Sequence, residues 1–233
     1  MPNIKLAVSQ PFSCSYLQGK EERLLFYCDD MPMSADLYSL LQANGFRRSE
    51  DMVYKPHCDD CKQCQSIRIP VAQFNPSKSQ KRVLNKCRQF DVKISTAISD
   101  NYYELFEKYI NTRHDDGTMY PAEPSQLDSF AKCQWLLPYF IEVYDNNSLI
   151  AVGIGDKTVD ALSAVYTFFD PEYDKYSLGT FMVLKQLEFA STMNKQWLYL
   201  GYYIQACAKM NYKTNFKPFQ VLHDTIWVEV KSF

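Results

Sequence analysis

The sequence predicts an α+β protein, with a smaller cysteine-rich region at residues 1–95 and a larger domain at residues 96–233. Segments rich in β-forming residues alternate with segments whose apolar residues recur at helical spacing. The apolar content of 46% and the charged content of 22% are those of an ordinary folded protein. The first third is irregular in pattern, and residues 1–95 hold six of the eight cysteines. We therefore expect it to form a separate N-terminal region.

The N-terminal region shows few regular elements. Ser34 can cap a helix that runs to about Asn44, and Gly45 would end that helix. Ser77 or Ser79 can open a basic helix, because a hydroxyl there would accept a bond from a free N–H group of the first turn. The other expected elements are a cysteine-rich loop and two strands, at residues 57–64, 67–71 and 92–96.

The expected elements of residues 96–233 are more regular. Asp100 can cap a first helix, Ser125 with Asp128 has the capping-box pattern of a second, and 145–147 is a turn between two strands. The order of the elements that follow is that of the acetyltransferase-like fold known as GNAT: an antiparallel hairpin, a strand, a loop and helix, a strand, a helix and a final strand. Other α+β domains share this order. The helices are expected at 100–113, 125–133, 178–194 and 206–213, and the strands at 138–144, 149–155, 161–169, 197–204 and 225–230.

Positive charge is concentrated in one stretch of an otherwise acidic chain. The net charge is −2, but residues 54–93 carry nine Lys and Arg against three Asp, or +6, which leaves −8 for the rest. A basic block of this kind suits a polyanionic partner, and it can equally be an ordinary solvated face. Charge alone leaves both interpretations open.

No targeting or membrane-spanning segment is visible in the sequence. The first twenty residues hold no apolar stretch behind a charged start, and no run approaches about 18 consecutive apolar residues. We therefore expect a cytoplasmic protein. In that reducing compartment, the eight cysteines are expected to be metal ligands, core residues or redox groups and not disulfides.

Cys58, Cys61 and Cys64 form the motif C-x2-C-x2-C. The first two have the spacing of a zinc knuckle, in which a tight turn aims both thiolates at one cation. The fourth ligand must come from elsewhere, and we favour Cys14 over three other candidates, Cys28, His57 and Cys87. A ferredoxin-type ligand set would need a cysteine at position 68, which is Arg. A structural zinc, an iron–sulfur cluster completed by distant cysteines and unmetallated thiols all stay open.

Two segments have features of phosphate-binding sites. Ser177, Leu178 and Gly179 stand between an expected strand and a helix start, where free N–H groups and the helix dipole attract phosphate. With one glycine the usual two-glycine acyl-coenzyme A pattern is incomplete, and Ser177 could simply cap the helix. The basic helix has cations that can contact phosphate oxygens without reading a base sequence, namely Lys78, Lys81, Arg82 and Arg88.

About ten short motifs, in order over nearly the whole chain, resemble those of one family. The N-terminal ones are CSYL, GFRRS, YKPHC with two further cysteines, and PSKSQKR, at residues 14–17, 45–49, 54–58 and 76–82. The C-terminal ones are RHxxG, LSAVYTF, SLGT, YLGY and KMxYK, at residues 113–117, 162–168, 177–180, 199–202 and 209–213. On these motifs the chain resembles the arginyl-tRNA–protein transferases and their short bacterial relatives, the aspartate/glutamate leucyltransferases. Its short length and the form of its motifs are most similar to the leucyl branch.

The resemblance implies transfer of Leu, or less commonly Arg, from a charged tRNA to the N-terminal Asp or Glu of an acceptor protein, which marks that protein for degradation. It also implies a GNAT-like C-terminal domain. The chain departs from the family pattern at Lys55 and Lys78, where Arg is usual, which keeps the charge and loses the two-pronged phosphate geometry. Cys28 and Cys87 are additional cysteines that leave the metal ligand set open.

An aminoacyl-tRNA is an activated ester, so amide formation requires no ATP and no cofactor. The enzyme must hold a neutral α-amine near the ester carbonyl, stabilise the oxyanion and protonate the leaving ribose hydroxyl. In a GNAT-like sheet the strands at 161–169 and 197–204 would diverge and receive the carbonyl, while 177–179 could cradle the terminal adenosine of the tRNA. The candidate catalytic residues are Tyr166, Tyr199 and Tyr202 as hydroxyl donors, Asp170 to take up the amine, and His114 as a base or loop-orienting residue.

The acidic side chain of the acceptor needs a positive partner. Arg113, Lys209 and Lys213 are the candidates, and we favour Arg113 because its planar guanidinium matches a carboxylate. Each tyrosine could instead be a core residue, His114 a structural one, and each charge part of a surface ion pair of little energy.

Two other functions fit part of the sequence. A coenzyme A-dependent N-acetyltransferase would share the fold, but the basic segment and the incomplete glycine loop count against it. A non-catalytic RNA-binding protein with a metal knuckle would bind tRNA without forming a product. Transfer of a labelled amino acid from tRNA to a peptide separates the three functions.

Overall fold

The structure, a computed structural model, describes residues 4–230. Its strands are β1 (Leu6–Val8), β2 (Phe12–Ser13), β3 (Glu21–Glu22), β4 (Leu24–Tyr27), β5 (Arg47–Ser49), β6 (Met52–Pro56), β7 (Gln65–Pro70), β8 (Asp91–Ser95), β9 (Tyr139–Asp145), β10 (Ser148–Lys157), β11 (Ala161–Phe169), β12 (Trp197–Tyr203), β13 (Phe219–His223) and β14 (Ile226–Val230). Its helices are α1 (Ala35–Ala43), α2 (Lys78–Cys87), α3 (Asn101–Arg113), α4 (Pro124–Ala131), α5 (Leu178–Thr192) and α6 (Ala208–Asn211), with 3-10 segments η1 (Val71–Gln73), η2 (Pro171–Tyr176) and η3 (Tyr212–Asn215).

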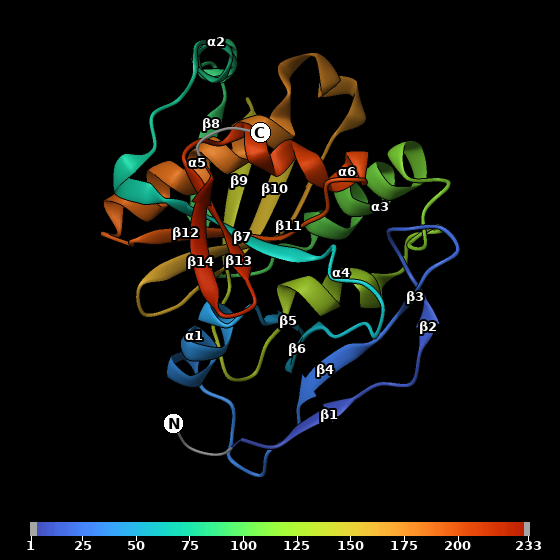
Figure 1. Cartoon of the computed structure of the whole chain (residues 1–233). Coiled ribbons are helices and arrows are strands. Elements are labelled where there is room, and N and C mark those ends of the chain that lie inside the picture. Colours follow the sequence, from blue (N-terminus) through green and yellow to red (C-terminus); the bar gives the residue numbers. More distant parts are fainter. Residues whose placement is uncertain (1–3, 231–233) are drawn as a thin grey trace.

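Eight strands form one mixed sheet through the centre of the molecule (Figure 1). Its order is β14-β13-β7-β12-β11-β10-β9-β8, and within residues 4–230 β11 and β12 are its only parallel neighbours. An antiparallel sheet, β1-β4-β6-β5, and the short pair β2-β3 complete the strands. The α+β class predicted from the sequence is confirmed.

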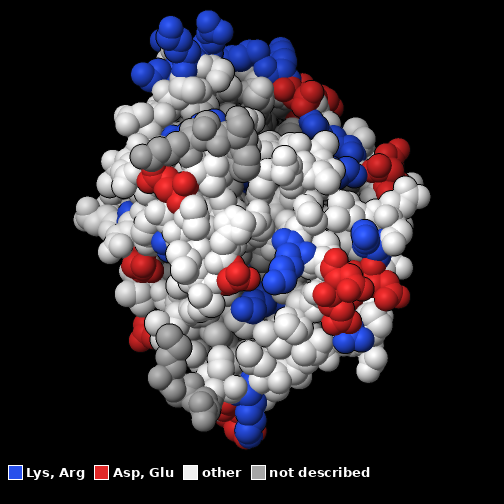
Figure 2. Space-filling model, viewed as in Figure 1, with Lys and Arg blue, Asp and Glu red and all other residues white. Residues whose placement is uncertain are grey.

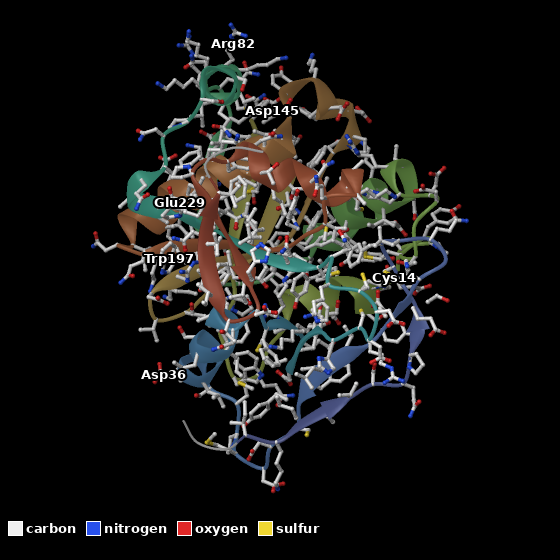
Figure 3. All side chains as sticks on the ribbon, viewed as in Figure 1. Cys14, Asp36, Arg82, Asp145, Trp197 and Glu229 are labelled. Atoms are coloured by element: carbon white, nitrogen blue, oxygen red, sulfur yellow. The ribbon has the colours of Figure 1, made fainter. Side chains whose placement is uncertain are left out.

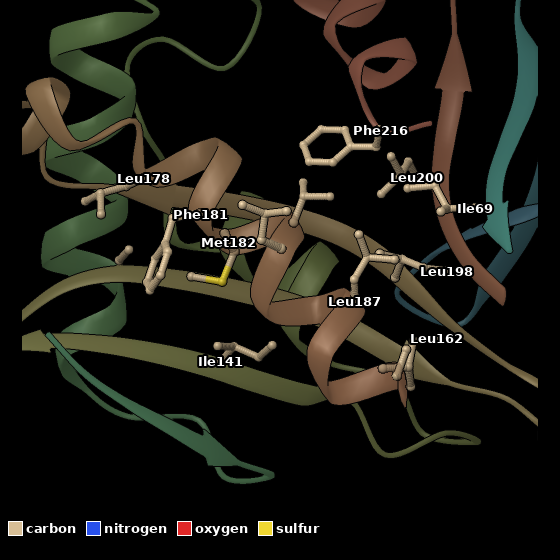
Figure 4. Packing of buried hydrophobic residues seen from close by; sticks show 14 of the residues in the cluster. Ile69, Ile141, Leu162, Leu178, Phe181, Met182, Leu187, Leu198, Leu200 and Phe216 are labelled. Carbon is tan, nitrogen blue, oxygen red and sulfur yellow. The ribbon is translucent and has the colours of Figure 1, made fainter. Parts of the chain in front are cut away.

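Helices cover both faces of the large sheet, α5 with α2 on one side and α3 with α4 on the other. Apolar side chains of α5 pack on the strands, as Figure 4 shows for Phe181, Met182 and Leu187. Burial of each such side chain contributes about 1.5–3 kcal/mol. This packing fixes where the first turn of α5 stands relative to β11.

Among the described residues, no helix has the length and apolar composition needed to span a bilayer.

The two parallel strands diverge soon after they begin, as the sequence predicted. The pairing of β11 with β12 covers only Ala161–Ser163 and Trp197–Tyr199. The register of β12 with β7 is irregular between Tyr199 and Tyr202, and Gly201 there has a φ of +76°. A positive φ favours glycine, since it has no Cβ to clash with the backbone. We refer to the place where β11 and β12 separate, after Ser163 and Tyr199, as the divergence.

A buried ion pair ties the small sheet to the large one. The Arg48 guanidinium on β5 donates to both carboxylate oxygens of Asp156 on β10, at 2.6–2.9 Å, and both side chains are 0% exposed. Arg48 also donates to the carbonyls of Phe130 and Lys132, and the Tyr38 hydroxyl donates to Asp156 at 3.4 Å. The charges are therefore well satisfied, as buried charges must be.

Several local predictions need correction. The first third contains the strands β1 to β6 where irregular chain was expected, and β13 was missed. Helix α4 begins at Pro124 with a capping box of Glu123 and Gln126, and the predicted box of Ser125 and Asp128 is wrong because proline is favoured in the first turn. Strands β7 and β8 precede residue 96 and yet belong to the large sheet. The domain boundary at 95/96 stays a prediction.

Candidate functional site

A polar cavity of about 370 Å³ lies between the beginnings of α2 and α5. Hydroxyl and amide side chains form much of its wall: Ser77, Ser79, Ser177, Thr180, Tyr212 and Asn215. The first N–H groups of a helix have no partner within the helix, and the helix dipole makes this end positive. Two such ends beside one polar cavity favour an anionic ligand such as phosphate.

The turn before α5 differs from the simple cap considered from the sequence. Ser177 has a φ of +56°, and its side chain makes no capping hydrogen bond. A Cβ built on Gly179 would meet only the ring of Phe169, at 3.7 Å, so the first turn of α5 is open on that side. Leu178 is buried in the core and anchors the turn. The turn therefore leaves space for a ligand beside Gly179.

The predicted basic side chains lie on helix α2, whose N-terminal half contributes to the wall of this cavity, and directly after its last residue. Figure 2 shows Lys and Arg gathered over the end of the molecule where α2 lies, and Figure 3 shows Arg82 pointing outward there. Lys78, Lys81, Arg82 and Arg88 are exposed, and none of the four forms an ion pair with a described carboxylate. These charges are free to meet an external polyanion.

A second cavity, of about 280 Å³, is lined by the four predicted metal ligands, Cys14, Cys58, Cys61 and Cys64. Figure 3 shows Cys14 on the side of the N-terminal strands. Burial, together with the three neighbouring cysteines, raises the pKa of the Cys64 thiol to about 12. Four thiols are a suitable donor set for structural zinc. Within residues 4–230, however, no three His, Cys, Asp or Glu side chains are arranged to hold a metal ion, so zinc stays a prediction.

Arg47 enters the divergence from the small sheet, and its role was missed in the sequence. Its Nη2 donates to the carbonyls of Ala164 and Val165 on β11, at 3.3 and 3.1 Å. Its Cζ lies 5.7 Å from the centre of the Tyr202 ring. A Cβ on Gly201 would come within 2.5 Å of Arg47 Nη1, so glycine at 201 makes room for the guanidinium.

Lys213 lies beside Arg47 and is only 5% exposed. Its Nζ donates to the Tyr202 carbonyl and lies 3.5 Å from the sulfur of Met210. Burial, and after it the charge of Arg47, lower its pKa to about 7, although Cys207 and Cys64 act in the opposite direction. Of the three cations predicted to bind the acceptor, Lys213 is the one placed at the divergence.

The pKa of Lys213 predicts a pH effect on stability. An unfolded lysine titrates near pH 10.4, so between about pH 7 and 10 the unfolded chain holds one more proton and stability rises with pH. From pH 7 to 9 the free energy of unfolding should rise by about 2 kcal/mol more in the wild type than in Lys213→Met. Urea titrations of both proteins at both pH values measure this difference, and equal rises would show that Lys213 titrates normally.

The three predicted catalytic tyrosines differ in how far their hydroxyls are committed. Tyr202 donates to the carbonyls of Gly45 and Tyr54, at 3.0 and 3.4 Å. The Tyr199 hydroxyl accepts a bond from Arg68 Nη1 at 3.2 Å. Tyr166 has a single weak contact, 4.0 Å from the sulfur of Met119, and its ring stacks on Phe130 at 4.2 Å. Burial raises its pKa, so Tyr166 keeps a proton to donate.

The other predicted residues gather near the C-terminal end of β11. His114 Nε2 lies 3.2 Å from the Tyr109 hydroxyl, and burial, Lys209 and Arg113 lower its pKa. Arg113 and Lys209 already form ion pairs with acidic residues, Asp174 and Asp116 respectively. Asp170 accepts a bond from Glu172 N, at 3.0 Å, and pairs with Lys108. The roles of these residues stay predictions.

Known proteins match the chain along most of its length. Residues 12–82 match the family described as "Arginine-tRNA-protein transferase, N terminus", and residues 101–223 match its counterpart, "Arginine-tRNA-protein transferase, C terminus". An "Aspartate/glutamate leucyltransferase" of Pseudoalteromonas atlantica is 49% identical over 224 residues, which are 96% of each chain. A protein of the same description from Shewanella oneidensis is 44% identical over 224 residues, covering 96% of this chain and 94% of its own.

A solved structure, "The structure of L-PGS from Bacillus licheniformis", is similar in fold, with a TM-score of 0.53 at 10% identity. The similarity covers 82% of this chain and 62% of the other. That neighbour is GNAT-like, so the predicted GNAT-like fold is confirmed. The two family matches and the identity to full-length relatives together show that the chain is an aminoacyltransferase belonging to the arginine-tRNA-protein transferase family.

Proposed function

We propose that the chain transfers leucine from leucyl-tRNA to an N-terminal Asp or Glu at the divergence of β11 and β12. Its relatives named as aspartate/glutamate leucyltransferases, at 44–49% identity, support the reaction. One structural observation supports the place: the divergence has side chains from the walls of both cavities near it. Tyr212 lines the polar cavity and Tyr202 lines the cysteine-lined cavity. Lys213 Nζ donates to the Tyr202 carbonyl and lies 6.0 Å from the centre of the Tyr212 ring.

The polar cavity suits the donor. The 3′ end of a charged tRNA carries phosphates, a terminal adenosine and the aminoacyl ester. Its last phosphates would meet the serine hydroxyls and helix starts of the cavity, and the preceding ones would meet the cations of α2. The ester would then reach past Tyr212 to the divergence.

The chemistry asks for positioning more than for strong acids or bases. The α-amine of the acceptor attacks the ester carbonyl, and the oxyanion collapses as the ribose oxygen leaves with a proton; the nitrogen gives up one proton, which restores the group that protonated the ribose oxygen. Tyr166 has the least committed hydroxyl of the three predicted tyrosines and would protonate that oxygen. Tyr202 and Tyr199 would hold the walls of the site, since their hydroxyls already have partners.

Zinc, if it binds at the four cysteines, would have a structural role. It would cross-link the loop of Cys58, Cys61 and Cys64 to the segment at Cys14 and so stabilise one wall of the second cavity. The transfer step needs no metal. Coenzyme A-dependent acetylation, the other function considered, is not supported by the similarity to leucyltransferases.

The proposed reaction is tested with labelled leucyl-tRNA and peptides that begin with Asp, Glu or Ala. Label is expected on the Asp and Glu peptides alone, and acetyl-coenzyme A should give no product. In a Lys81→Ala/Arg82→Ala variant, the affinity for leucyl-tRNA should fall, because two phosphate contacts are lost. The slope of log affinity against log salt concentration should become shallower by about 1.4–1.8. An unchanged salt slope would place the tRNA away from α2.

A further inference from the structure

Two basic side chains at the divergence have no carboxylate partner. Within residues 4–230, neither Arg47 nor Lys213 has an Asp or Glu oxygen within 4.0 Å. Several other cations of the domain are paired, as Arg48–Asp156, Lys108–Asp170, Arg113–Asp174 and Lys209–Asp116 show. Asp156 does feel the charge of Arg47, but both its oxygens are occupied by Arg48. The site therefore holds the uncompensated charge of Arg47 and, beside it, the amino group of Lys213, which is protonated in part near pH 7 and which a bound anion would charge more fully.

Their placement is constrained and does not result from chance exposure. Arg47 is half-buried and held by two carbonyls of β11, the Tyr202 ring and the space left by Gly201. Lys213 is almost fully buried. Leaving two positive groups without a counter-charge in a poorly solvated place lowers stability, so such a pair is expected where an anion binds during function.

The anion can be a donor phosphate or an acceptor carboxylate. The donor phosphates already have a suitable place at the polar cavity and along α2. Arg47, in contrast, comes from β5, and the neighbouring Ser49 and Tyr54 of the small sheet line the second cavity, on the far side of Tyr202. A planar guanidinium also fits a carboxylate in two-pronged geometry. These features favour the acceptor.

We propose that Arg47 and Lys213 together bind the side-chain carboxylate of the acceptor's N-terminal Asp or Glu and so select acidic N-termini. The assignment rests on the proposed function and adds the residues that read the substrate. A carboxylate can pair with Arg47 and with protonated Lys213 and offsets one positive charge, a neutral side chain offsets none, and a basic N-terminal side chain would add a further positive charge. The site therefore discriminates by rejection as well as by attraction.

The test compares peptides that begin with Asp and Asn and are otherwise identical, since these residues have nearly the same shape. In Arg47→Gln, kcat/KM for the Asp peptide should fall about 100-fold, mostly through KM, while the value for the Asn peptide changes less than about 3-fold. Arg47→Lys keeps the charge but loses the planar guanidinium, and kcat/KM should fall about 10-fold for the Asp peptide alone. Lys213→Met should likewise reduce the preference for Asp. Lys5→Gln, which removes a distant exposed charge paired with Asp30, is the control and should keep the wild-type preference.

Retention of leucyl-tRNA on a filter and thermal unfolding are measured for every variant. The proposal is supported if the Asp/Asn preference collapses while tRNA retention and folding persist. Equal losses on both peptides, or loss of tRNA retention, would overturn it in favour of a role in the chemistry or in phosphate binding. Collapse of the preference in Arg113→Ala and not in Arg47→Gln would assign the carboxylate to Arg113. A wild-type chain that leaves both Asp and Glu peptides unlabelled would count against the proposed function itself.

Discussion

Replacing Asp156 by Ala should lower the free energy of unfolding by about 3–5 kcal/mol, because Arg48 would be left buried without its counter-charge. Both side chains are 0% exposed, and their hydrogen bonds connect β5 to β10. Removing one partner of a buried pair costs more than the pair contributes, since desolvation of the remaining charge is no longer offset. A domain with a total stability of about 5–15 kcal/mol would be close to unfolding at 37 °C. Urea titration followed by circular dichroism measures the change.

A double replacement separates the ion pair from the packing. Arg48→Met/Asp156→Leu removes both charges and fills similar space, and it should recover most of the stability lost in Asp156→Ala. The Phe130 and Lys132 carbonyls lose their donor in this variant, so a residual loss of about 1–2 kcal/mol is expected. A loss below about 1 kcal/mol in Asp156→Ala would show that solvent reaches Arg48.

Gly201→Ala should reduce kcat/KM for leucyl transfer by about 100-fold or more. The new methyl group would clash with the Arg47 guanidinium, at 2.5 Å from Nη1 and 2.6 Å from Cζ. Arg47 would have to shift, and its bonds to the β11 carbonyls would be strained or lost. A misplacement of about 1 Å in a positioning group already costs on the order of 100-fold in rate. Transfer to an Asp peptide gives the rate.

Gly19 offers a matched control for the backbone effect of this change. It has a φ of +71°, close to the +76° of Gly201, and no atom lies within 4 Å of an added Cβ. Gly19→Ala should therefore carry a similar backbone penalty, about 1 kcal/mol or somewhat more, with wild-type activity. If Gly201→Ala behaves like Gly19→Ala, the position of Arg47 has no part in the reaction.

The regular second half of the chain could be predicted closely from the sequence. The expected strand at 161–169 coincides with β11, and the expected helix over 100–113 differs from α3 by one residue. These elements are long and buried, so their periodicity is strong. The strands β1 to β6 were missed because they have two to five residues and largely lack a buried alternating face.

The site was harder to predict because its contacts are distant in sequence. Arg113 was the favoured cation for the acceptor and Lys209 another candidate, yet both are ion-paired, with Asp174 and Asp116, which lie 61 and 93 residues away. Arg47 and Arg48 stand in one motif, and alternation along a strand sends them in opposite directions, to the divergence and to Asp156. Recognising 47–49 as a strand would have been the one signal that separates their roles.

The central position of β7 has a consequence for how the chain is made. β7 is paired with β12 on one edge and β13 on the other, and both follow it only after residues 71–196 have been synthesised. Until β12 and β13 have been synthesised, β7 has no strand partner on either edge, and unpaired strand edges are prone to aggregation. Final closure of the sheet therefore belongs to the last stretch of translation, so a nascent chain that stalls before β12 is a natural client for chaperones.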